Sequence, residues 1–125
     1  ENTESGFNYM RSRGATTIYE YLNNDRASQN HPMFGACVRQ MFTGLLGVRQ
    51  RENTVGWMDV IVEPLLTSLV KTASGHVMTP CGAVRVSFDV TRGSLYVDIP
   101  DGLTAALRLN GAEQPLPAGQ HTFEI

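Results

Sequence analysis

The feature that most restricts the fold of this chain is a change in its hydrophobic period near residue 50. Before that point apolar side chains recur every three or four residues, which is typical of one face of a helix. This helical set is Phe34, Val38, Met41, Leu45 and Val48. After that point apolar and polar residues alternate, which is typical of half-buried strands. The pattern predicts an α+β chain with a helical part, residues 1–52, and a β part, residues 53–125.

The helical part carries two start signals. Thr17 and Glu20 have the spacing of a capping box, in which a threonine hydroxyl and a glutamate three residues later satisfy first-turn amides. This signal predicts a short helix over residues 17–22, followed by a polar loop over residues 23–29. Asn30 then offers an N-cap for a second, longer helix with Pro32 in its first turn, and Gly47 is placed as its C-cap glycine.

The β part predicts a small antiparallel sandwich. Glycine-containing turns recur at short intervals from residue 74 to residue 119, and such short connections favour antiparallel neighbours. No helical stretch separates the turns, so a sandwich of about seven short strands is expected. Residues 49–53 are charge-rich and are expected to form a linker. The inward-facing positions of the best alternating runs are Val84, Val86, Phe88, Leu95, Val97 and Ile99.

Composition excludes several classes of protein. A formal net charge of −2 and an isoelectric point near 5.9 give no basic surface for a nucleic acid. The apolar runs are too short to span a membrane. His31, His76 and His121 are widely separated, so no metal site is expected. Cys37 and Cys81 have neither metal-ligand spacing nor the density of a disulfide scaffold, and we expect two buried free thiols, with a disulfide between them as the alternative.

The second helix is apolar on more than one side, since Met33, Phe42 and Leu46 lie off its main stripe. A helix of this kind normally has several neighbours. Either it packs on the sandwich alone, or the chain is the tail of a larger protein. In the second case we expect the isolated fragment to self-associate.

Two short motifs carry a resemblance to a known family. Residues 14–20, GATTIYE, and residues 30–35, NHPMFG, resemble successive signatures near the end of the catalytic barrel of bacterial α-L-rhamnosidases. The segments around Gly47 and Trp57, and a strand ending at Pro64, are similar to that family's passage into a C-terminal sandwich. The resemblance spans nearly the whole chain. It implies the closing helices of an (α/α)6 barrel followed by a β-sandwich, as the C-terminal fragment of an inverting glycoside hydrolase.

The resemblance also implies roles for three residues. Glu20 matches the family's general base, and His31 matches a histidine that contacts the sugar. Tyr19 stands where the family usually has tryptophan, and could supply an apolar surface near the substrate. The general acid would lie on an earlier segment outside this chain, so the fragment alone is expected to be inactive. The partner would be a rhamnose-containing glycan or glycoside, with no cofactor, and the family's habit favours a periplasmic or extracellular location.

Each assignment has a structural alternative. From spacing alone Glu20 is better explained as a helix cap, and His31 as an ordinary residue beside an N-cap. The sandwich could be an accessory module that binds carbohydrate or only braces the barrel. Carbohydrate binding needs exposed rings on one sheet face, and the strands offer only Trp57, Phe88, Tyr96 and Phe123, so bracing is favoured. The chain could also end another helical-barrel glycosidase or a glycoside phosphorylase.

Overall fold

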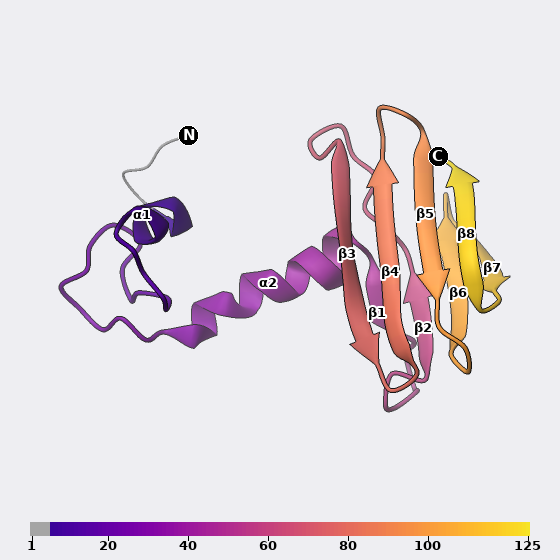
Figure 1. Ribbon diagram of the computed structural model, residues 1–125, viewed down its shortest axis with the longest axis horizontal. Helices are drawn as coiled ribbons and strands as arrows, with labels where there is room; N and C mark the ends of the chain where they lie inside the picture. The colour runs from indigo at the N-terminus through magenta and orange to yellow at the C-terminus, as the bar shows by residue number, and fades with distance from the viewer. Residues whose placement is uncertain (1–5) are drawn as a thin grey trace. The chain divides into compact units, whose positions relative to one another are not determined.

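The computed structural model of the 125-residue chain describes residues 6–125 (Figure 1). The chain forms two compact units, Glu1–Arg39 and Gln40–Ile125. The second unit is a β-sandwich of two four-stranded sheets. One sheet has the order β1 (Val48–Gln50), β2 (Asp59–Val62), β6 (Thr104–Leu109), β7 (Ala112–Leu116). The other has the order β3 (Thr72–Thr79), β4 (Gly82–Asp89), β5 (Ser94–Ile99), β8 (Gly119–Glu124).

The core between the sheets confirms the predicted register of the central strands. Side chains that alternate along β4 and β5 face inward, and none of the six predicted positions is more than 4% exposed. These positions are Val84, Val86, Phe88, Leu95, Val97 and Ile99. Val60 and Val62 of β2 and Leu107 of β6 complete the same core from the opposite sheet. A one-residue slip would expose all of them, so burial fixes the register.

The sandwich is not wholly antiparallel, in contrast to the prediction. Strands β2 and β6 pair in parallel, with Asp59 beside Thr104 and Val62 beside Leu107. A hairpin turn cannot join a parallel pair, and here three strands of the other sheet lie between β2 and β6 in sequence. The remaining pairs are antiparallel.

The expected linker also contains a strand. Val48–Gln50 forms β1, which pairs with β2, so the charge-rich segment begins inside a sheet. Val48 is fully buried and belongs to this strand rather than to the helical stripe. Gly47 precedes it with φ +71°, the left-handed conformation expected of a glycine that ends a helix. The C-cap prediction is therefore confirmed.

The helical residues form short segments. The predicted helix over residues 17–22 is absent, and these residues are irregular. A six-residue helix that the sequence analysis missed, α1 (Phe7–Ser12), precedes them and begins without a side-chain cap. The predicted second helix is present as three consecutive pieces: η1 (Pro32–Gly35), α2 (Ala36–Gln40) and η2 (Met41–Leu45). The last piece is a π-helix, closed by a bond from the Leu46 amide to the Met41 carbonyl.

The apolar stripe of this second helix is largely uncovered. Met33, Phe34 and Val38 are all exposed, as is Met41 at the start of η2. The two cysteines are free, as predicted, but neither is buried: Cys37 is exposed and Cys81 is half-buried. Cys37 lies on this exposed helix, and Cys81 lies in the turn between β3 and β4, where it packs against the edge of the core and is only partly covered. No helix among residues 6–125 is long and apolar enough to cross a membrane.

Candidate functional site

Glu20 lies in the irregular segment of the first unit and faces a second loop. Its backbone amide donates to the Ser28 carbonyl at 2.8 Å, and its Oε2 accepts from the Ser28 amide at 3.3 Å. The second of these bonds holds the carboxylate against residue 28 through one of its two oxygens. Among the described residues no hydrogen-bond donor to Oε1 is found, so this oxygen is open to a hydrogen bond from another group.

The capping-box interpretation of Glu20 is wrong in this structure. No helix starts at Thr17, and the Thr17 hydroxyl donates to the Gln29 carbonyl instead of capping a first turn. Thr17 and Glu20 therefore each bind the loop of residues 28–29 rather than each other's amides. The local sequence pattern was compatible with a cap, but the loop offered both side chains better placed partners.

His31 adjoins the same region. Its amide donates to the Ile18 carbonyl at 2.7 Å, which ties the start of η1 to the segment containing Glu20. The imidazole stacks on Phe34 with ring centroids 5.8 Å apart and an angle of 20° between the planes. Its Nδ1 is buried without a hydrogen-bond partner among the described residues. A buried ring nitrogen without a partner is unusual and marks a position where a polar ligand atom could bind.

Tyr19 has a different environment. Tyr19 is only 6% exposed and, like Met10, is a buried residue of the first unit. The ring therefore presents little surface to solvent here.

A largely apolar pocket of about 560 Å³ lies beside Glu20. Its lining includes Phe7, Leu22 and Cys37 together with Tyr21 and Phe34. Phe34 both lines this pocket and stacks on His31, so the structure connects two of the predicted site residues through one ring. The sequence analysis did not identify Phe7, Tyr21 or Phe34 as pocket residues. Tyr21, directly after Glu20, and Phe34 of the NHPMFG motif were the available signals.

A second, more polar pocket of about 660 Å³ shares Tyr21 and is lined by Tyr9, Arg13 and Asp25 among others. Arg13 Nη2 donates to Asp25 Oδ2 at 3.1 Å. This hydrogen bond, more than the charge of the guanidinium, lowers the pKa of Asp25 below its usual range. Within residues 6–125 no group of three or more histidine, cysteine or acidic side chains is placed to hold a metal ion.

The outer face of the β1-β2-β6-β7 sheet carries a chain of ion pairs. Arg51 contacts Asp59 and Glu113, at 3.1 and 3.0 Å. Arg108 contacts Glu113 at 2.7 Å and Glu63 at 3.4 Å. Arg49 also pairs with Glu63. Hydrogen bonds from Arg108 and then Arg51 lower the pKa of Glu113. We call these six residues the ion-pair chain; it links strands β1, β2, β6 and β7 and their flanking residues.

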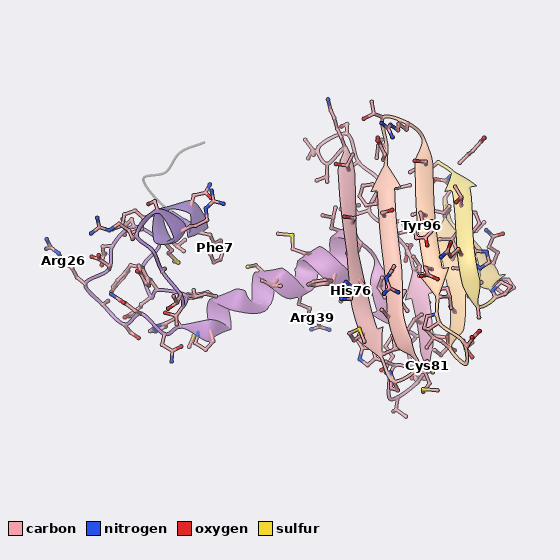
Figure 2. The ribbon with its side chains drawn as sticks, viewed as in Figure 1. Phe7, Arg26, Arg39, His76, Cys81 and Tyr96 are labelled. Atoms are coloured by element: carbon pink, nitrogen blue, oxygen red, sulfur yellow. The ribbon has the colours of Figure 1, made fainter. Side chains whose placement is uncertain are left out.

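The aromatic residues of the sandwich are divided between core and surface. Phe88 is buried, and Trp57 and Phe123 are partly buried against the core. Trp57 thus packs at the edge of the core, and its positive φ of 58° is unusual for an aromatic residue. Tyr96 points to the outer face of the β3-β4-β5-β8 sheet, where it is half-exposed (Figure 2).

Comparison with known proteins places these features in a family. Residues 47–124 match the family described as the bacterial alpha-L-rhamnosidase C-terminal domain. An alpha-L-rhamnosidase from Alteromonas sp. (strain LOR) is 27% identical over 94% of this chain and 16% of its own length. The chain therefore spans about one sixth of this curated relative.

Solved structures of rhamnosidases have the same fold. The enzyme from Aspergillus terreus superposes over 100% of this chain and 16% of its own, with 20% identity and a TM-score of 0.80. The enzyme from Streptomyces avermitilis, solved with L-rhamnose, covers 100% of this chain and 15% of its own, with 19% identity and a TM-score of 0.76. The enzyme from Dictyoglumus thermophilum gives 20% identity and a TM-score of 0.75 over 98% of this chain and 17% of its own. With its sandwich matched almost end to end by the family, the chain belongs to the bacterial α-L-rhamnosidase C-terminal domain family.

Proposed function

We propose that this chain is the C-terminal part of an enzyme that hydrolyses terminal α-L-rhamnose with inversion. In this proposal the helical residues before β1 complete a helical catalytic barrel, and the sandwich, which begins with β1, braces it. The family match and the similarity to α-L-rhamnosidases over most of the chain support the activity. The observation that carries the site is the free Oε1 of Glu20 beside a pocket that also includes the ring stacked on His31.

Glu20 is proposed as the general base. Inversion requires two carboxyl groups roughly 6.5–9.5 Å apart, one on each side of the scissile bond. Glu20 would take a proton from a water molecule as the water oxygen bonds to C1 of rhamnose. The bond from C1 to the glycosidic oxygen breaks, and that oxygen takes a proton from a general acid. The acid is proposed to come from residues outside this chain, so the chain alone would not turn over substrate.

His31 is proposed to hydrogen-bond a rhamnose hydroxyl, and its buried Nδ1 without a partner supports a polar contact at this position. Tyr19 is proposed as an apolar support for the site rather than a catalytic group. Because the ring is buried, Tyr19 would act by supporting the backbone of Glu20. It would contact the sugar directly only if the complete barrel moved the ring.

The test is Glu20→Gln in the complete enzyme. Glutamine can still accept the Ser28 amide, so the loop contact is kept while the basic group is lost. Turnover of an aryl α-L-rhamnoside should fall about 10²–10⁴-fold, with little change in thermal stability. Glu124→Gln on β8 is the matched control and should keep parental turnover. Near-parental turnover by Glu20→Gln would place the base elsewhere.

Two further measurements complete the test. NMR of the first-formed sugar should show β-L-rhamnose, because inversion reverses the anomeric centre. His31→Ala should weaken substrate binding more than it lowers turnover, and its loss in turnover should be smaller than that of Glu20→Gln. Phosphate-dependent turnover in the complete protein would identify a phosphorylase instead.

A further inference from the structure

The outer face of the β3-β4-β5-β8 sheet contains a hollow of about 300 Å³. Its lining includes Ser74 and His76 from β3, Arg85 and Ser87 from β4, and Tyr96 from β5. All of these belong to the sandwich unit, whose strands form a complete two-sheet core. Figure 2 shows His76 and Tyr96 on this sheet.

The strand register explains why a hollow exists here. Ser74 lies beside Ser87, and Ser87 beside Tyr96, so one row across the sheet has two small side chains next to an aromatic ring. The adjacent row has His76 beside Arg85 and Arg85 beside Asp98. Long side chains therefore border a floor of small ones, and the Tyr96 ring has free space next to it.

The chemistry of the hollow suits a neutral, hydroxyl-rich ligand. The backbone groups of β4, at the centre of the hollow, pair with β3 on one side and β5 on the other, so a ligand there must bind through side chains. The serine hydroxyls donate and accept, and the guanidinium supplies several donors in one plane. Asp98 Oδ2 lies 3.5 Å from Arg85 Nη1 and offsets its charge, which disfavours an anion as the ligand. The tyrosine adds an amphipathic ring.

We propose that this hollow, formed by Ser74, His76, Arg85, Ser87 and Tyr96, binds a saccharide unit. The C–H face of a pyranose would lie on the Tyr96 ring, and its hydroxyls would bond Arg85 and the two serines. The site is separate from the proposed catalytic residues and needs no turnover to act. In the complete protein it would hold a sugar of the substrate glycan while the catalytic unit acts on another.

The experiment is an NMR titration of the 125-residue chain, labelled with ¹⁵N, with L-rhamnose and separately with D-glucose. We expect amide shifts on β3, β4 and β5 with a dissociation constant on the order of 1 mM, because small ligands in shallow sites bind weakly. Shifts with rhamnose alone would identify the glycan's terminal sugar as the ligand, and shifts with glucose would identify a backbone hexose.

Variants decide whether the hollow is responsible. Tyr96→Ala should weaken binding at least about fivefold, and Tyr96→Phe should keep most of it, since the ring supplies the stacking surface. Arg85→Ala should also weaken binding. Arg92→Ala, in the β4–β5 turn with its side chain 83% exposed, is the matched arginine control and should bind as the parent does.

Three outcomes would overturn the proposal in chains whose spectra remain dispersed. These are equal binding by Tyr96→Ala and the parent, shifts confined to residues 6–39, and no shifts with either sugar. The second outcome would instead support the proposed catalytic region. Because the Glu20→Gln assay measures turnover in the complete enzyme, either proposal can fail without the other.

Discussion

Gly47 and Glu63 are in direct backbone contact: the Glu63 amide donates to the Gly47 carbonyl at 2.9 Å, and a Cβ at position 47 would overlap the Glu63 carbonyl group. The contact joins the end of the helical segments to the residue that follows β2. Only glycine fits both the positive φ and the space.

Gly47→Ala should therefore destabilise the chain by about 2–4 kcal/mol, since a steric clash adds to left-handed strain of about 1–2 kcal/mol. Urea unfolding measures the difference. Gly111→Ala is the control, because its φ is +80° but a Cβ there meets nothing within 4 Å. It should cost only the strain. Equal losses in the two variants would mean that the 47–63 contact relaxes freely.

Leu46 and Gly75 should be energetically coupled. The Leu46 Cδ1 would lie 2.5 Å from a Cβ at position 75, and Leu46 is buried in the core. Leu46→Ala should cost about 2–5 kcal/mol by leaving a cavity, and Gly75→Ala about 1–3 kcal/mol by overpacking. The added methyl should partly fill the cavity, so the double variant should lose less than the sum. Simple additivity in denaturant titrations would contradict this packing.

The ion-pair chain should make stability depend on pH through Glu113. The Arg108 and Arg51 hydrogen bonds lower its pKa from the ordinary 4.5, so the folded state binds the proton less readily than the unfolded chain. The contribution is fully present above that value and is lost as the pH falls through the lowered pKa. Glu113→Gln should lower the melting temperature at neutral pH and make its decline on acidification shallower. Glu124→Gln, on the other sheet, should leave the shape of the pH curve unchanged.

The isolated chain should self-associate through its second helix. Met33, Phe34 and Val38 are exposed apolar side chains, and such surface favours association. Val38→Lys should reduce the apparent mass measured by light scattering at high concentration. Leu69→Lys removes an even more exposed apolar side chain, on the sandwich unit, and should not reduce it. A strictly monomeric parent chain with that helix ordered would argue against this prediction.

The core of the sandwich could be predicted from sequence because burial and period are linked directly. Once the alternation of apolar and polar residues was recognised, the apolar positions from Val84 to Val97 had to face the core. The parallel pairing of β2 with β6 could not be predicted, because no local signal records which distant strand lies beside Asp59 to Val62. Ile61 is buried although it faces away from the core valines, because β2 is a central strand and arginine side chains surround it.

The helical part was less predictable for the same reason. Thr17 and Glu20 have a spacing that two structures can use, and contacts with Ser28 and Gln29 decide between them. His31 and Phe34 are three residues apart. This spacing permits the turn that stacks their rings, but it does not require that turn. Tyr96 was recognised as an aromatic residue, but its place beside two serines depends on strand register.

The parallel pair also orders the folding reaction. Strands β3, β4 and β5 contact their immediate neighbours in sequence and can form a three-stranded meander early. Strand β2 can pair early with β1, but its other edge must wait for β6, since Asp59 pairs with Thr104 across more than forty intervening residues. Bringing β2 and β6 together costs chain entropy before the contacts between them can form. The meander should therefore form first, and the other sheet should close over it. During synthesis on the ribosome, Val60 and Val62 would therefore have only β1 beside them until β6 emerges.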